Sequence, residues 1–306
     1  MNSDAFIYSI ERGDRLNALQ ITECSSAVRL DNSYRTVTPV VVDGTPYLFA
    51  NAADLDYFDL YRFSARPPWL EIVSAKPKLA GVADAAEFFV IGNLPHLMTY
   101  SQKDGQSAFF AIAPDLSMSK PYKHSNDISA GYTTVKVFTY FGQIGVLAYN
   151  GDNGAVAIYG VSVISTSSGD VPPLEQRAIW THTWAKGWTR FAIYQFGGEN
   201  FFLKTNTERP NVNIDHILDD PKQGTIEVAS HIDLEDALQL DLVQSFSLTN
   251  GEPYFLTYRK DSGLSTFNRF HSDCAGWTKV GSISAKPQAS NAVFISADDK
   301  LFLVVT

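Results

Sequence analysis

Hairpin turns recur along this chain at nearly constant intervals. Apolar runs are interrupted at six places by residue pairs, mostly small or polar, that suit tight hairpin turns. The pairs are Asp43-Gly44, Gly92-Asn93, Phe141-Gly142, Gly197-Gly198, Asn250-Gly251 and Asp298-Asp299. The intervals between their second residues are 49, 49, 56, 53 and 48. Self-similarity at this period predicts a repeated supersecondary unit that must stack on its neighbours to bury a core.

The period also continues across the two ends of the chain. Seven residues follow Asp299, so the interval through the joined ends to Gly44 is 51. Segment 290–306 is therefore expected to supply the first two strands of a unit whose last two strands are 5–13 and 17–25. Backbone hydrogen bonds between the ends would then close the repeats into a ring.

Each unit is predicted to hold four short strands, which we name A to D, with the turn above joining A to B. Three prolines share one slot just after the turn, Pro46, Pro95 and Pro253, at a strand start where a missing N–H is tolerated. Pro39, inside an A strand, requires one unpaired strand edge. No stretch with helical periodicity competes, except HIDLEDALQL at 231–240, which is expected to be a connecting loop.

This organisation resembles the β-propeller architecture over the whole chain, without the motifs of any particular propeller family. The resemblance implies an all-β, six-bladed β-propeller with four-stranded antiparallel blades, around a central channel with the D–A and B–C loops at one face. We expect one domain over 1–306, its last blade closed by two strands from each terminus. The expected blades are 33–80, 81–127, 128–185, 186–235, 236–285, and 286–306 with 1–32.

Composition narrows the classes of partner. The net charge of -9, without clustered Lys and Arg, disfavours nucleic acid. No apolar run reaches the roughly 18 residues of a membrane helix. Without a recognisable signal peptide or glycosylation sequon, the chain is predicted to be cytoplasmic, and Cys24 and Cys274 to be reduced thiols. Oligomeric state stays open.

Aromatic residues stand at matching positions where three A strands begin. Tyr34, Tyr132 and Trp188 would lie at one level of the ring, where their flat faces could stack on a sugar, an aromatic group or a cation. Packing between blades is the alternative for each of them.

Charged and polar residues follow just inside the A strands: Arg35, Glu87, Lys136, Arg190, Asp241 and Asn291. Such residues rarely enter a core unpaired, so they predict a water-filled channel. As a site, Arg35, Lys136 and Arg190 would hold an anion, with Glu87 or Asp241 as a base or hydrogen-bond acceptor. As plain channel lining, the same residues would form structural ion pairs.

Histidines and acidic hairpins give weaker signals. His231 and His124 are expected near D–A connections, where His231 becomes a catalytic candidate beside Glu87, Lys136, Arg190 and Asp241. His96 is expected to pack. The acidic hairpins could hold calcium, but turn chemistry explains their side chains equally simply, so we predict no metal and no cofactor. The residues concerned are Asp54, Asp56, Asp59, Asn150, Asp152 and Asn153.

Three functions remain open from the sequence. The first is a lectin-like propeller that binds a glycan or polar small molecule at the channel mouth through Tyr34, Arg35, Tyr132, Lys136, Trp188, Arg190 and Asn291. The second is an enzyme, a lyase, cyclase or hydrolase of a small metabolite, which strongly diverged blades would suit. The third is a protein-interaction scaffold, which an exposed apolar patch would favour.

Overall fold

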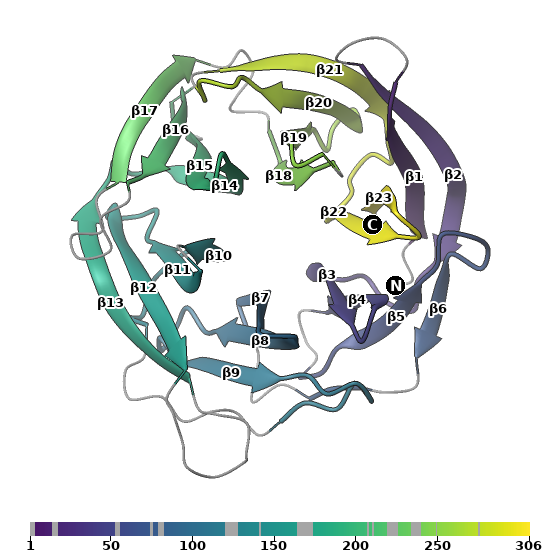
Figure 1. Cartoon of the computed structure of the whole chain (residues 1–306), viewed down its shortest axis with the longest axis horizontal. Coiled ribbons are helices and arrows are strands. Elements are labelled where there is room, and N and C mark those ends of the chain that lie inside the picture. The colour runs from purple at the N-terminus through teal and green to yellow at the C-terminus, as the bar shows by residue number, and fades with distance from the viewer. Residues whose placement is uncertain are drawn as a thin grey trace.

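A computed structural model describes most of the chain. The described residues are 4–13, 18–52, 56–73, 76–78, 83–119, 128–140, 142–163, 174–206, 208–209, 211–218, 226–233, 240–248, 250–274 and 276–306, with backbone alone at 26–27, 140 and 226–233. They form an all-β ring of six antiparallel sheets around a central channel, a six-bladed β-propeller (Figure 1). In the described part of the chain, no helix has the length and apolarity needed to cross a membrane.

Blades 1 to 3 follow one another along the chain. Blade 1 contains β3 (Thr36–Val42), β4 (Thr45–Asn51), β5 (Asp59–Phe63) and β6 (Leu70–Val73). The described part of blade 2 contains β7 (Ala85–Ile91), β8 (Leu94–Tyr100) and β9 (Ser107–Ala111). Blade 3 contains β10 (Thr134–Tyr140), β11 (Gln143–Tyr149), β12 (Ala155–Val163) and β13 (Leu174–Thr183).

Blades 4 to 6 complete the ring. Blade 4 contains β14 (Trp188–Phe196), β15 (Glu199–Asn206), β16 (Asn211–Ile217) and β17 (Ile226–Asp233). Blade 5 contains β18 (Leu242–Ser247), β19 (Pro253–Tyr258), β20 (Leu264–Phe270) and β21 (Trp277–Ser284). Blade 6 contains β22 (Ala292–Ala297), β23 (Lys300–Val305), β1 (Asp4–Arg12) and β2 (Leu19–Arg29).

The predicted closure is confirmed in blade 6. Its strand order is β2-β1-β23-β22, and Phe6 of β1 pairs with Val305 of β23. Five of the predicted hairpin turns are confirmed as well, since each lies between strands A and B, while Phe141 of the third predicted turn lies outside the described residues. At the first turn, φ is 48° at Asp43 and 74° at Gly44, the left-handed region in which a two-residue hairpin turn matches the twist of its strands.

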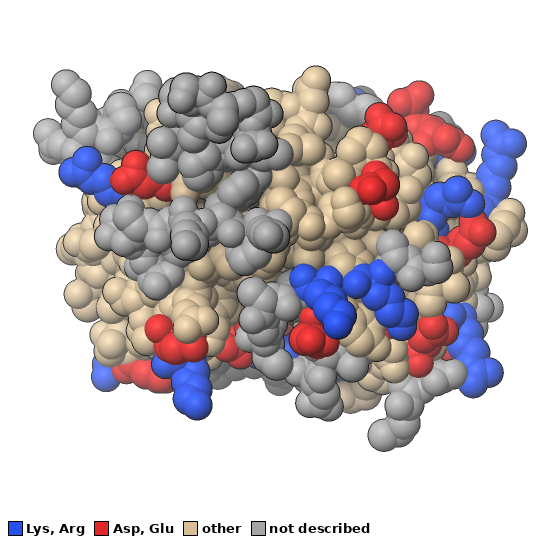
Figure 2. Space-filling view, turned by 90° about the horizontal axis from the view of Figure 1, so that it is seen from below, with Lys and Arg blue, Asp and Glu red and all other residues tan. Residues whose placement is uncertain are grey.

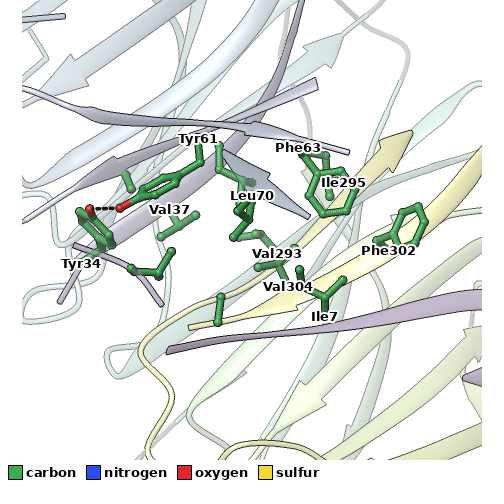
Figure 3. Close-up of a cluster of buried hydrophobic side chains, with 14 of the residues drawn as sticks. Ile7, Tyr34, Val37, Tyr61, Phe63, Leu70, Val293, Ile295, Phe302 and Val304 are labelled. Atoms are coloured by element: carbon green, nitrogen blue, oxygen red, sulfur yellow. Dashed lines mark hydrogen bonds between the residues drawn. The ribbon is translucent and has the colours of Figure 1, made fainter. Parts of the chain in front are cut away.

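The core is divided into six apolar wedges, one between each pair of neighbouring blades. Figure 3 shows the wedge that joins blade 6 to blade 1, where Ile7, Val293 and Val304 pack toward Val37 and Leu70. Because each wedge needs side chains from two blades, stability depends on the closed ring. Both cysteines are free thiols, Cys274 inside the wedge between blades 4 and 5 and Cys24 packed against the wedge of Figure 3.

Candidate functional site

A polar cavity of about 370 Å³ opens where the A strands begin. All six blades contribute to its wall, since each A strand enters the channel from a D–A connection at this level. Its charged and amide-bearing lining residues are Arg35, Asp84, Glu87, Lys136, Arg190, Gln244 and Asn291. We call this space the polar cavity.

Two ion pairs join neighbouring blades across the wall of the polar cavity. Arg35 of blade 1 lies 3.0 Å from Asp84, and Lys136 of blade 3 lies 2.6 Å from Glu87, both carboxylates belonging to blade 2. The four side chains keep 21 to 42% of their surface exposed. Water therefore screens these pairs, and a ligand can compete for either partner.

Arg190 differs from the other two cations of the polar cavity. Its Nε donates to the Asp241 carbonyl oxygen at 2.6 Å, and Nη1 donates to the Thr189 carbonyl oxygen at 3.0 Å. Within the described residues it has no carboxylate partner. The two carbonyls orient the guanidinium but leave its charge uncompensated, which suits a ligand anion.

Asn291 lies in the cavity wall, but its amide is occupied by the protein. Its Oδ1 accepts from the Val37 amide at 3.3 Å, while Nδ2 donates to the Tyr34 carbonyl at 3.1 Å and to Thr306 Oγ1 at 3.2 Å. These bonds join the first residues of blade 1 to both ends of the A–B hairpin of blade 6. Asn291 therefore links blade 6 to blade 1 through hydrogen bonds.

Two of the three aromatic rings predicted for the site, those of Tyr34 and Trp188, are buried in the wedges and do not line the polar cavity. Tyr34 and Trp188 are each only 4% exposed, and Tyr132 is half-buried against the wedge between blades 2 and 3. Tyr34 Oη donates to Asp59 at 2.8 Å and lies 2.7 Å from Tyr61 Oη, the contact dashed in Figure 3. Burial raises the pKa of Tyr34 and of Tyr132. The wedges take up these rings because packing against a neighbouring blade buries more apolar area than a channel position would.

Two catalytic candidates are not among the described residues that line the polar cavity. The Asp241 carboxylate accepts from the Lys260 amide at 2.6 Å, so it fastens the start of strand A to the end of strand B. His231 belongs to β17, the outermost strand of blade 4, and not to a connecting loop as expected. Figure 1 places β17 at the outer rim, on the far side of the blade from the channel.

The other histidines and the acidic hairpins have local explanations. His96 is 3% exposed and stacks on Phe89, with ring centroids 5.4 Å apart, and burial lowers its pKa. In the third B–C hairpin, Asn150 Oδ1 accepts from the amides of Asp152 and Asn153, as in an Asx turn. In the described residues no three His, Cys, Asp or Glu side chains converge on a metal position. Asp54 and His124 lie outside the described residues.

Sequence reasoning missed two charged or amide-bearing residues of the cavity, Asp84 and Gln244, and one repeated structural contact. Asp84 precedes its A strand by one residue, as Asp241 does, and its Oδ2 likewise accepts a backbone amide beyond strand B, that of Gln102 at 2.8 Å. Tyrosines end three B strands and donate to the connection entering the next blade, namely Tyr100 to Ser129, Tyr149 to Ala185 and Tyr258 to Lys286. The 49-residue interval from Tyr100 to Tyr149, equal to the turn interval, was an available signal.

Charge is mixed on the side of the ring that Figure 2 shows. Figure 2, a view from the side of the ring, shows basic and acidic side chains interspersed over the described surface, without a broad field of one sign. Binding of nucleic acid requires clustered cations, and the described residues on this face do not form such a cluster. The charged groups that converge are those of the polar cavity.

Comparison with protein-family models and with curated proteins gave no match. Among solved structures, a proposed 6-phosphogluconolactonase from Bacteroides fragilis is 12% identical with a TM-score of 0.56, over 96% of this chain and 85% of that one. A proposed 6-phosphogluconolactonase from Bacteroides uniformis is 13% identical with a TM-score of 0.52, over 95% of this chain and 86% of that one.

A glycoside hydrolase-type protein, the xyloglucan GH43B of Bacteroides ovatus, is 12% identical with a TM-score of 0.50. That match covers 84% of this chain and 56% of the other. Identities this low carry the fold and no activity. The chain is thus a six-bladed β-propeller that is similar in architecture to these sugar-related proteins.

Proposed function

We propose that this propeller binds a small polar anion, such as a sugar acid or sugar phosphate, in the polar cavity. The observation that carries the proposal is the charge of the cavity wall, where, among the residues that the structure describes, the cations Arg35, Lys136 and Arg190 stand beside the two carboxylates Asp84 and Glu87. The volume of about 370 Å³ lies within the roughly 300 to 1,000 Å³ typical of small-molecule sites.

Arg190 is the expected anchor. A guanidinium presents a planar fork of donors that matches a carboxylate or phosphate, and that of Arg190 is already oriented by two carbonyls. Lys136 and Arg35 would add charge after partial release from Glu87 and Asp84. Gln244, Thr36 and Thr134, which lie in the wall, offer hydrogen bonds for the hydroxyl groups of a sugar.

A neutral glycan is a poorer fit than an acidic one. A lectin-like site needs exposed aromatic faces to stack on a sugar ring, and the rings of Tyr34 and Trp188 are inside the wedges. The remaining recognition chemistry is charge and hydrogen bonding, which favours sugars that carry a carboxylate or phosphate.

Calorimetric titration with gluconate, 6-phosphogluconate and neutral glucose tests the proposal. We expect the two anions to bind and glucose not to, and Arg190→Ala to weaken anion binding about 10- to 100-fold, the range for a lost charge-assisted hydrogen bond. Arg66→Ala, a change at an exposed arginine outside the cavity, is the matched control. Equal affinity in the native protein and Arg190→Ala would contradict the proposal.

An enzyme using the same cavity is the second candidate, favoured by the contact between Glu87 and Lys136 inside it. In lactone hydrolysis, Glu87 would take a proton from water as the water oxygen bonds to the carbonyl carbon. Lys136 and Arg190 would stabilise the oxyanion, and as the ring C–O bond breaks, the leaving ring oxygen would take the proton from Glu87, giving an acid and an alcohol. Hydrolysis of 6-phosphogluconolactone no faster than in buffer would exclude this candidate and leave the binding proposal standing.

The scaffold function has less support. The large exposed apolar residues of the described chain lie on five different strands of blades 1, 2, 3 and 5, namely Val41, Ile72, Val90, Val163 and Leu264. Only Val41 and Val90 share a surface, and that surface belongs to the channel.

A further inference from the structure

One side of the second half of the channel is apolar. A cavity of about 330 Å³ lies toward the A–B hairpins, lined by the later residues of three A strands in neighbouring blades 6, 1 and 2. Its lining residues are Pro39, Val40, Val41, Phe88, Phe89, Val90, Phe294, Ile295 and Ser296. We call this space the apolar cavity.

The apolar cavity leaves large side chains in contact with water. Val41 is 51% and Val90 is 54% exposed, the highest values among the large hydrophobic residues that are exposed in the described chain. Phe88 and Phe294 are half-buried in the same wall. Apolar surface held open in a concave wall gains free energy when a ligand covers it.

The two cavities form successive parts of one channel. Pro39 lines both, and the A strands of blades 1, 2 and 6 pass from one cavity into the other. Along β7 the wall changes from Glu87 to Val90 within three residues, which is about 10 Å at the usual rise of a strand. A single elongated molecule can therefore contact the charged groups and the apolar wall together.

We infer that the ligand is an amphipathic anion, with a carboxylate or phosphate head at Arg190 and Lys136 and an apolar tail against Phe88, Val90 and Phe294. The inference rests on the proposed function, which it extends from the head group to the whole ligand. Its orientation follows from desolvation, because a charged head loses its hydration in the apolar cavity while a hydrocarbon tail gains nothing among charged groups.

A series of alkyl phosphates with one head and increasing tails tests the inference. Methyl, butyl, hexyl and octyl phosphate are titrated calorimetrically into the native protein below their micelle concentrations. Each methylene that enters the apolar cavity is expected to tighten binding about fourfold, until the cavity is filled. In Val90→Asp the gain with tail length should disappear, because a carboxylate then stands in the apolar wall where the tail would pack.

Val163→Asp is the matched control, since Val163 is a 42% exposed valine on β12, outside the channel. It should keep the full gain with tail length. Val41→Ser, at the other exposed valine of the cavity, is a second test that adds no charge, and it should reduce the gain. Circular dichroism and thermal unfolding verify that each variant is folded.

The failures of the two proposals are distinguishable. If methyl and octyl phosphate bind equally, or if Val163→Asp loses the gain as Val90→Asp does, the tail assignment is overturned and the anion site stands. If no phosphate or sugar acid binds in an Arg190-dependent way, the proposed function itself is overturned.

Discussion

Ion pairs occur in two opposite surroundings in this ring. In the polar cavity, Lys136 and Glu87 keep 38% and 21% of their side chains exposed, whereas Lys204 and Asp215 inside blade 4 keep 2% and 0%. The first pair spans two blades at a water-filled wall. The second joins the adjacent strands β15 and β16 of one blade.

The buried pair is enclosed by aromatic rings. The Lys204 ammonium lies 3.7 Å from the ring centroid of Trp184 and 4.9 Å from that of Trp188. Burial lowers the pKa of Lys204 and raises that of Asp215, since loss of water penalises both charged forms. Removing one partner of the buried pair leaves the other charge buried and uncompensated. At the polar cavity, water can solvate the charge that remains. The fold therefore depends on the buried pair of Lys204 and Asp215, whereas a ligand can displace one partner from an ion pair of the polar cavity.

The largest expected effect follows from breaking the buried pair. Asp215→Ala should lower the free energy of unfolding by about 3 to 5 kcal/mol, because Lys204 is left buried without a counter-charge. Urea unfolding at neutral pH measures the change. The double variant Lys204→Met with Asp215→Leu should recover most of the lost stability. If Asp215→Ala were as stable as the native protein, the buried pair would not differ from the exposed pairs.

Raising the pH into the alkaline range tests how strongly burial affects tyrosine side chains, without any substitution. Burial raises the pKa of Tyr8 and Tyr254 to about 12, against 10 for the exposed group. Because the folded pKa is the higher one, their contribution to stability is complete below pH 10 and is lost as pH rises from 10 to about 12. Each tyrosine should contribute up to about 1 kcal/mol of loss per pH unit in this range, since water screens part of the effect.

Unfolding in urea at pH 8, 10 and 11 measures this loss, and the ultraviolet titration of tyrosinate follows ionisation directly. Tyr254→Phe should make stability less sensitive to pH in this range. Identical titration curves for the folded and unfolded chain would contradict the assignment of burial as the cause.

The smallest effect is expected at the polar cavity. Arg35→Ala, which removes the ion pair with Asp84, should change the free energy of unfolding by less than about 1 kcal/mol, because both side chains reach water. Added salt should further reduce the difference between native and variant. A loss as large as that of Asp215→Ala would show that the wall pairs hold the ring together, and they could then not open for a ligand.

The repeat, the strand order and the closure were predictable because they depend on local signals. The turn at Asp43-Gly44 needs two residues that accept positive φ, and such pairs mark strand ends without reference to the rest of the chain. Counting from one turn to the next then places every A strand, and the interval across the termini predicts the pairing of β1 with β23.

The candidate site was predictable only in part. Arg35, Glu87, Lys136 and Arg190 reach the polar cavity because each stands near the start of a strand located by its turn. Tyr34 and Trp188 stand near the same starts but point into the wedges, and a shift of one residue exchanges the two faces of a strand. His231 was misplaced because its segment lacks a turn signal that would have separated strand from loop.

Sequence alone determined the number of blades and the way the ring closes, since these follow from the spacing of turns. Tertiary structure decided which residues of different blades come into contact. Glu87 and Lys136 are 49 residues apart and become neighbours only when blades 2 and 3 pack. The polar cavity and the apolar cavity of the channel are likewise each formed by side chains of several blades. The physical reason is that turn conformation depends on neighbouring residues, whereas burial and ion pairing depend on every surface that packs against a residue.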